Sequence, residues 1–339
     1  MSQAKGYKGR FRAPLFAALA LAAAPAMARD IKIGLPVDCT LGEDCYIQQF
    51  FDRNPAPGVV QDMACGTLAN DGHGGVDFAV PSLRAMKDGV DVIAAAPGTV
   101  VAFRDEMPDV SSLSEAAPDL EGRDCGNGVV VDHGGGWRTQ YCHLRLGSVT
   151  VETGQKVRMG TPLGQIGMSG RASFPHMHFT LRKGDLKVDP YGPDASATGE
   201  CSLDTTPQGV WLEAPDYVPG GLLQAGFADH VPNIAQVREG MVTAAETPAD
   251  TAAMVVWGYA FAGQIGDEIE IIFTGPEGEI GRHIEELEKG QPFLLRGYGK
   301  RTPVMGWLPG DYIGLVIHRR DGEEISRKRV TTTVPGEAP

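Results

Sequence analysis

Residues 169–182 read Ser-Gly-Arg-Ala-Ser-Phe-Pro-His-Met-His-Phe-Thr-Leu-Arg. Side chains alternate between the two faces of a strand, so we expect His176, His178 and Thr180 to share one face. The three apolar residues that alternate with them then form a row suited to a core. Two imidazoles side by side on a rigid strand suit metal ligation or proton transfer. An isolated His-x-His pattern is equally compatible with a polar exposed face, so the interpretation depends on the rest of the chain.

A second motif far upstream supplies that context. His73-Gly-Gly-Val-Asp77 places a histidine and an aspartate four residues apart, on one side of an extended segment. Glycines between and before them allow a tight turn. Together with His178 from the distant strand they offer three candidate ligands. Catalytic zinc sites use three protein ligands and leave the fourth position for water.

Residues 71–192 resemble the catalytic domain of the lysostaphin-like (LytM-type) zinc peptidases, which cut peptide bonds in peptidoglycan. The matching motifs occur in the order found in that family, at residues 73–78, 92–100, 126–133, 141–144, 154–157, 160–167, 175–179 and 188–190. The resemblance covers roughly 120 of 339 residues. It implies that the chain is a metallopeptidase of this type.

The resemblance also implies a role for each candidate residue. His73, Asp77 and His178 would bind Zn²⁺, while His143 and His176 would be non-ligand histidines acting on the metal-bound water and the developing oxyanion. Zinc lowers the pKa of bound water to about 7. Histidine, with an ordinary pKa of about 6.5, is suited to moving protons in such a reaction. The remaining histidines have no partners at ligand spacing.

Two functions fit this set. The first is a zinc-dependent endopeptidase that hydrolyses peptidoglycan cross-links, by analogy the D-alanyl–diaminopimelyl bond rather than a glycine bridge. The second is a catalytically inactive LytM-like regulator that binds and activates a cell-wall amidase. Loss of metal ligands marks that second group. Because all five candidate residues are present here, the sequence favours the enzyme.

The first 28 residues indicate export. Four basic side chains precede an apolar run at 13–24 and an Ala-Met-Ala site at 26–28, the pattern of a cleaved signal peptide. An uncleaved interfacial anchor is the alternative. No later apolar run approaches the roughly 20 residues of a membrane helix. We expect a periplasmic protein, with secretion also possible, and no membrane span after cleavage.

The charge balance excludes some partners. The net charge is −13, and near −17 without residues 1–28. An acidic chain without a basic stripe is a poor candidate for binding nucleic acid, and its bulk charge opposes adhesion to anionic lipid.

All six cysteines follow the expected signal peptide, at positions 39, 45, 65, 125, 142 and 201. An even number in an oxidising compartment indicates disulfides, although six cysteines allow 15 pairings. We expect Cys125 to pair with Cys142, because they flank two strands that meet at a Gly-Gly-Gly turn. That bridge would lie beside His143 and help to fix it.

The fold class follows from many short strand-like runs separated by glycine turns. They lie at 76–80, 90–94, 99–103, 129–132, 138–141, 148–151 and 176–182, with a possible helix at 111–117. This pattern is typical of a mostly β, antiparallel domain. It agrees with the LytM-type fold, a duplicated hybrid motif, that the resemblance implies.

Five regions are predicted along the chain. They are a signal peptide at 1–28, a disulfide-rich lead-in at 29–70, the peptidase domain at 71–200, a linker region at 201–251 and an accessory domain at 252–339. Strand-like runs and the turn Arg320-Asp321-Gly322 make the last region an immunoglobulin-like β-sandwich. Its role is glycan binding, protein binding or stabilisation.

Two departures from the LytM-type pattern affect substrate preference. The acidic loop at 104–123 is longer than usual, and either forms a rim of the site or bulges into solvent. Phe174 stands where many relatives have glycine before Pro-His. This aromatic ring either contacts substrate or packs in the core.

Overall fold

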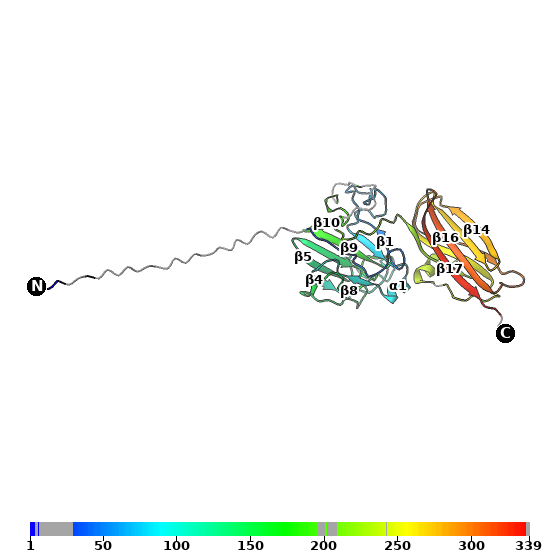
Figure 1. Cartoon of the computed structure of the whole chain (residues 1–339), viewed down its shortest axis with the longest axis horizontal. Coiled ribbons are helices and arrows are strands. Elements are labelled where there is room, and N and C mark those ends of the chain that lie inside the picture. Colours follow the sequence, from blue (N-terminus) through cyan, green and yellow to red (C-terminus); the bar gives the residue numbers. More distant parts are fainter. Residues whose placement is uncertain (4–5, 7–29, 196–200, 202–208, 242, 337–339) are drawn as a thin grey trace.

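The computed structural model describes residues 1–3, 6, 30–195, 201, 209–241 and 243–336. Nearly all of the expected signal peptide therefore lies outside the described residues. Figure 1 shows two β-rich bodies side by side, the first carrying β1 to β10 and the second carrying β13 to β17. Within the described ranges, no helix is long and apolar enough to cross a bilayer.

The first body is built on an antiparallel sheet of eight strands. Their order is β1-β2-β9-β6-β5-β4-β7, and β10 pairs with β9 beside β2. The strands are β1 (Tyr46–Gln49), β2 (Val76–Ala79), β4 (Gly98–Arg104), β5 (Gly128–Gly134), β6 (Trp137–Cys142), β7 (Lys156–Val157), β9 (His176–Lys183) and β10 (Leu186–Val188). A second pair joins β3 (Asp91–Ile93) to β8 (Pro162–Gln165). The prediction of a mostly antiparallel β fold is confirmed.

Strand β9 lies in the middle of this sheet and has two different faces. Met177, Phe179 and Leu181 are fully buried in the main hydrophobic core. The intervening His176 and His178 lie on the opposite face and keep partial exposure. The alternation predicted from residues 176–181 is therefore present, and it directs both histidines away from the core.

The second body is a sandwich of two antiparallel sheets, with strand orders β11-β12-β15 and β14-β13-β16-β17. The strands are β11 (Gly221–Ala228), β12 (Ala253–Gly263), β13 (Glu268–Gly275), β14 (Gly278–Glu286), β15 (Gln291–Arg301), β16 (Gly310–Arg320) and β17 (Glu323–Val334). The first, second and fifth strands share one sheet, and the third, fourth, sixth and seventh share the other. Apart from the fourth strand, this is the division found in the seven-stranded immunoglobulin fold. Apolar residues of both sheets meet in one core.

Several local predictions were wrong. The segment expected as a linker contains β11, which pairs with β12, and the helix α2 (Ile234–Glu239). Residues 111–117 form turns rather than a helix, and 148–151 form no strand. The other short helices, α1 (Leu83–Asp88) and the 3-10 turn η1 (Pro193–Ala195), were not predicted. These pieces are too short to carry a clear periodic pattern.

The two bodies share a buried apolar cluster. Tyr46, Ala79 and Phe174 of the first body pack with Trp257 and Phe261 of the second. The ring of Phe174 is 4% exposed and lies 5.6 Å from the ring of Phe293, centroid to centroid. Phe174 is therefore a packing residue between the bodies, the second of the two alternatives that the sequence left open.

Three disulfides account for all six cysteines: Cys39–Cys45, Cys65–Cys201 and Cys125–Cys142. The predicted Cys125–Cys142 bridge is confirmed. It links the residues just before β5 to the end of β6, which pairs with β5 in antiparallel register.

Candidate metal centre

Three of the predicted residues converge on one point of the sheet. Asp77 of β2 lies opposite His178 of β9 in the strand register, and His73 lies just before β2. His73 Nε2 is 3.2 Å from Asp77 Oδ1 and 3.1 Å from His178 Nδ1, and His178 Nδ1 is 2.8 Å from Asp77 Oδ1. The pairing of β2 with β9 thus brings together residues that are 101 positions apart.

The outer nitrogen of each imidazole is already engaged. His73 Nδ1 donates to the Phe50 carbonyl at 2.6 Å, and His178 Nε2 lies 2.9 Å from Thr180 Oγ1, which accepts from it in the tautomer protonated at Nε2. With these tautomers, both inner nitrogens present lone pairs toward the Asp77 carboxylate. Three electron-pair donors at about 3 Å repel one another unless a proton or a metal ion lies among them.

The donor set fits zinc on chemical and geometric grounds. Two imidazoles and one carboxylate are common zinc ligands, and ligands held by such partners are oriented for binding. Tetrahedral zinc with bonds of about 2.0–2.1 Å separates its ligand atoms by roughly 3.3 Å. The observed separations of 2.8–3.2 Å are close to that value.

The electrostatics keep the carboxylate charged. Burial disfavours the ionised form of Asp77, but the neighbouring imidazoles of His73, His176 and His178 outweigh it. They hold the pKa of Asp77 well below its ordinary value. An ionised carboxylate is therefore available to a cation at neutral pH.

The two predicted accessory histidines lie beside this cluster. The ring centroids of His143 and His176 are 4.7 Å apart, and His176 Nε2 is 3.9 Å from Asp77 Oδ1. His143 Nδ1 donates to the Ser169 carbonyl at 2.7 Å, and His176 Nδ1 donates to the Phe174 carbonyl at 2.7 Å. Each ring therefore has its Nε2 free of these backbone contacts.

His143 is the more enclosed of the pair, with 7% of its surface exposed. Burial, together with His176 and His178 nearby, lowers the pKa of His143 well below its usual range. Its backbone has a φ of 64°, and its N–H donates to the Cys125 carbonyl at 2.8 Å. The Cys125–Cys142 disulfide is adjacent to both ends of that hydrogen bond, so it helps to fix the histidine.

The structure adds positioning residues that the sequence did not reveal. The lead-in supplies the Phe50 carbonyl to His73, and the N–H of Asp52 donates to the His73 carbonyl at 2.9 Å. The Asp52 carboxylate also accepts from the N–H of Gly72 at 2.8 Å. A backbone carbonyl cannot be recognised in the sequence as a hydrogen-bond partner. Thr180 was the one positioning residue that the sequence indicated, because alternation places it on the same face as His178.

The long loop at 104–123 is tied down at its start. Asp105 accepts from the N–H groups of Gly147 and Val149, and Asp109 accepts from those of Leu146 and Met168. These contacts fix the loop beside the segment that includes Ser169, the partner of His143. The first half of the loop is therefore held against the domain by four hydrogen bonds from backbone N–H groups.

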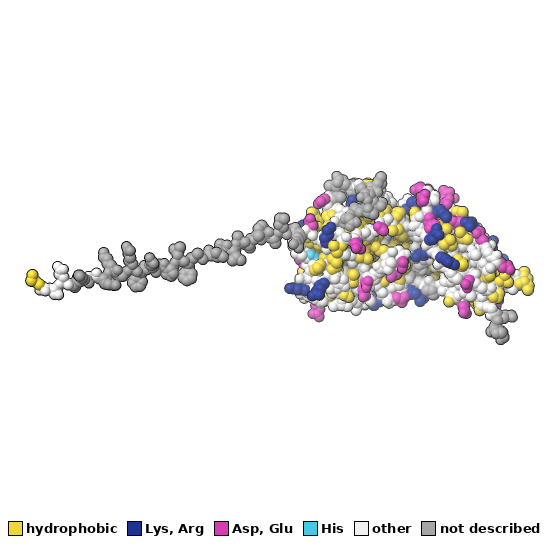
Figure 2. Space-filling view, viewed as in Figure 1, with side chains coloured by type: hydrophobic (Ala, Val, Ile, Leu, Met, Phe, Trp, Pro, Cys, Tyr) yellow, Lys and Arg dark blue, Asp and Glu magenta, His cyan; other side chains and the backbone are white. Residues whose placement is uncertain are grey.

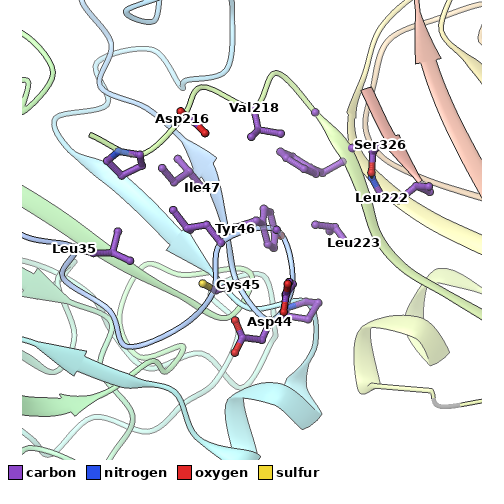
Figure 3. A pocket seen from close by; sticks show the side chains of 18 of the residues that line it. Leu35, Asp44, Cys45, Tyr46, Ile47, Asp216, Val218, Leu222, Leu223 and Ser326 are labelled. Carbon is purple, nitrogen blue, oxygen red and sulfur yellow. The ribbon is translucent and has the colours of Figure 1, made fainter. Parts of the chain in front are cut away.

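A cavity of about 740 Å³ lies away from His73, Asp77, His143, His176 and His178. Figure 3 shows Leu35, Tyr46 and Ile47 on one side of it and Leu222 and Leu223 of β11 on the other. No residue of the histidine cluster lines it. A second three-residue group of potential ligands, Cys39, Asp44 and Cys45, adjoins it, but both cysteines are in a disulfide and do not offer thiolates.

Residues 71–190 match the sequence model of Peptidase family M23. The chain is 33% identical over 109 residues to the peptidoglycan DD-endopeptidase ShyA of Vibrio cholerae, covering 32% of this chain and 20% of that protein. It is 30% identical over 118 residues to the DD-carboxypeptidase/endopeptidase Mpg of Neisseria meningitidis, covering 35% and 22%.

A third relative is the cell division protein DipM of Caulobacter vibrioides, 30% identical over 105 residues, with 31% of this chain and 16% of that protein covered. The chain thus spans about a fifth of the length of the curated relatives it matches. Among solved structures, a zinc-containing peptidase from Vibrio cholerae has 25% identity and a TM-score of 0.27, over 44% of this chain and 40% of that one.

Proposed function

We propose that residues 71–190, which form a domain of peptidase family M23, hydrolyse peptide cross-links of peptidoglycan. Relatives named as peptidoglycan DD-endopeptidases support this substrate class, and their names favour a D-alanyl bond, which agrees with a D-alanyl–diaminopimelyl cross-link. The observation that carries the proposal is the convergence of His73, Asp77 and His178 within hydrogen-bond distance.

In this proposal His73, Asp77 and His178 would hold Zn²⁺ through Nε2, one carboxylate oxygen and Nδ1 respectively. When bound, zinc supplies Lewis acidity and a water that is acidic enough to react at neutral pH. The Phe50 carbonyl fixes the tautomer of His73, and Thr180 accepts from His178 in the tautomer that points the second lone pair inward. The lowered pKa of Asp77 keeps the third ligand ionised.

His143 and His176 act on the attacking water and on the carbonyl oxygen. Each ring is fixed at Nδ1 by a backbone carbonyl, which leaves both Nε2 atoms available, and one of them would accept the proton that the attacking water releases and pass it to the leaving amine. The lowered pKa of His143 keeps that ring neutral before the reaction. The other imidazole would hydrogen-bond to the carbonyl oxygen and stabilise the negative charge that develops there.

The proposal extends to the whole chain. Residues 71–200 would be the peptidase domain, preceded by an export signal at 1–28 that directs the protein to the periplasm. The inactive-regulator alternative is not favoured, because all three ligand residues and both accessory histidines are retained.

The direct test digests purified sacculi with the protein, with and without a chelator, and identifies the products by mass spectrometry. We expect cross-linked muropeptides to be converted to monomers, with activity lost on chelation and restored by zinc. Unchanged muropeptides in the presence of zinc would contradict the proposal, and cleavage that resists chelation would contradict the metal assignment.

A further inference from the structure

The face of the sheet that carries His176 and His178, here called the histidine face, continues beyond the proposed metal centre. Along β9, Thr180 and then Arg182 follow His178 on that face, because strand side chains alternate. Residues paired across antiparallel strands project on the same side. Lys187 of β10 and Arg138 of β6 both pair with Arg182. Three cationic side chains therefore form a row across the histidine face.

This row lies close enough to the proposed metal centre to meet the same substrate. Four residues of strand separate Arg182 from His178, which corresponds to about 13 Å. Lys187 lies nearer, because a Cβ atom on Gly74 would be 2.4 Å from its Cδ and 2.9 Å from its Nζ. Gly74 directly follows His73. Lys187, His73 and Gly74 line a shared cavity of about 400 Å³.

Two of the three cations have no carboxylate partner among the residues that the structure describes. Arg138 pairs with Asp132 at 2.9 Å. The guanidinium of Arg182 contacts only a backbone carbonyl, that of Asp185, at 3.4 Å. Lys187 is exposed and makes no ion pair within the described ranges. The acidic chain thus places two unneutralised cations next to each other.

The carboxylates that line the same cavity already have partners. Asp52 accepts hydrogen bonds from the backbone N–H groups of Asn54, Gln61 and Gly72. Asp71 accepts from that of Gly58. The guanidinium of Arg53 is paired with Asp189. Among the described charged groups of this cavity, Lys187 is thus the one without a hydrogen-bond or ion-pair partner.

Like charges directly opposite each other destabilise a pair of strands. Elsewhere on the molecule, acidic and basic side chains are interspersed, as Figure 2 shows for one face. An anionic ligand that bridges Arg182 and Lys187 would remove this repulsion, and charge-assisted hydrogen bonds to carboxylate are among the stronger polar contacts.

We propose that Arg182 and Lys187 form a subsite for a free carboxylate of the peptide that flanks the scissile bond. This inference rests on the proposed function, because it takes the substrate to be a peptidoglycan stem peptide, which carries free carboxylates. An extended peptide advances about 3.3 Å per residue. A peptide lying along β9 therefore places a carboxylate three or four residues from the scissile bond within reach of the pair.

The test compares two synthetic cross-linked stem-peptide dimers, one with free carboxylates and one with the flanking carboxylates amidated. The full-length protein should cleave the free-acid dimer with a kcat/KM about tenfold higher or more, mostly through KM, the scale of one hydrogen bond to a charged group. The double variant Arg182→Gln/Lys187→Gln should lose this preference and cleave the amidated dimer as the unaltered protein does.

Lys183→Gln is the matched control. It makes the same charge change in the next residue of β9, but its ammonium lies on the opposite face, 4.2 Å from the Trp137 ring centroid. This variant should keep the preference for the free-acid dimer. Circular dichroism and zinc content should be the same in all variants, which separates a subsite effect from misfolding.

Binding of both dimers to chelator-stripped protein, measured by fluorescence anisotropy, separates the two proposals. Equal binding and equal cleavage of the two dimers would overturn the subsite while leaving the peptidase function intact. Tighter binding of the free-acid dimer, lost in the double variant, without any cleavage in zinc-loaded protein, would support the subsite and contradict the peptidase function.

Discussion

His178 is held on both sides of its ring. Asp77 contacts its Nδ1 at 2.8 Å and Thr180 contacts its Nε2 at 2.9 Å. The Thr180 side chain is 2% exposed, so no solvent competes for this contact. A ligand whose outer nitrogen is fixed in this way presents one tautomer to a metal.

Replacing Thr180 by valine keeps the shape of the side chain and removes its hydrogen bond to His178. We expect the affinity for zinc to fall by about 10- to 100-fold, the usual effect of losing such a partner. Competition with a fluorescent chelator measures this directly. Thr180→Ser, which keeps the hydroxyl, should retain most of the affinity, and equal affinities for both variants would contradict the assigned role.

A substitution of His143 tests whether this residue carries protons or binds the metal. His143→Ala should retain stoichiometric zinc but lower kcat by about 10² or more, the scale of a positioned acid–base group. Metal analysis and steady-state kinetics on the same preparation give both values. Loss of the metal in this variant would show that the roles are wrongly divided.

At the scale of elements, the sequence predicted the strands in which polar and apolar residues alternate. Strand β9 follows from the alternation of polar and apolar residues, and the turn at Asp321 and Gly322, both of which have positive φ, follows from the Asp-Gly pair. The meeting of Asp77 with His178 was expected from the resemblance to the zinc peptidases. Strand β11 was missed because its sequence, Gly-Leu-Leu-Gln-Ala-Gly-Phe-Ala, is rich in small residues and has no clear period of two.

Strand β16 contains a histidine whose partner the sequence did not reveal. His318 is fully buried, and its Nε2 donates to Asp267 at 2.7 Å. Its Nδ1 has no hydrogen-bond partner among the described residues. Protonation there would bury an unpaired N–H, which agrees with a lowered pKa for His318, caused chiefly by burial.

The sandwich should therefore lose stability in acid. Because the folded state lowers the pKa of His318, the unfolded chain binds more protons, and stability falls as the pH drops below about 6.5. Hydrogen bonds from Arg320, Gln264 and His318 outweigh burial and lower the pKa of Asp267, which adds a loss in the same direction below about 3.8.

Calorimetry from pH 7.5 to pH 5.5 measures the first part of this loss. His318→Gln, which keeps a donor toward Asp267 but does not titrate, should show a smaller decrease in the melting temperature of the sandwich over this range. An identical decrease in both proteins would contradict the role of His318.

At the scale of the whole molecule, contacts between distant segments hold the site in place. The lead-in contacts His73 through Phe50, and Arg53 forms a buried ion pair with Asp189, 136 residues away, at 2.7 Å. The sequence predicted a disulfide-rich lead-in at 29–70. It could not predict these partners, because tertiary contacts at such separations have no local pattern.

Removing one partner of a buried ion pair leaves the other charge uncompensated. We expect Arg53→Ala to lower the free energy of unfolding by about 3–5 kcal/mol. The matched control is Arg171→Ala, whose pair with Asp124 is exposed and should contribute less than about 1 kcal/mol. Chemical denaturation of both variants provides the comparison, and equal losses would contradict the structural role of the buried pair.

The account as a whole depends on whether His73, Asp77 and His178 bind one metal ion. Isothermal titration of chelator-stripped, full-length protein with zinc tests this most directly, with His178→Ala beside it and His230→Ala, an exposed histidine of the second body, as the control. We predict one tight site in the unaltered protein and in His230→Ala, and none in His178→Ala. Tight zinc binding that persists in a folded His178→Ala protein, or no binding in any of the three, would contradict the account.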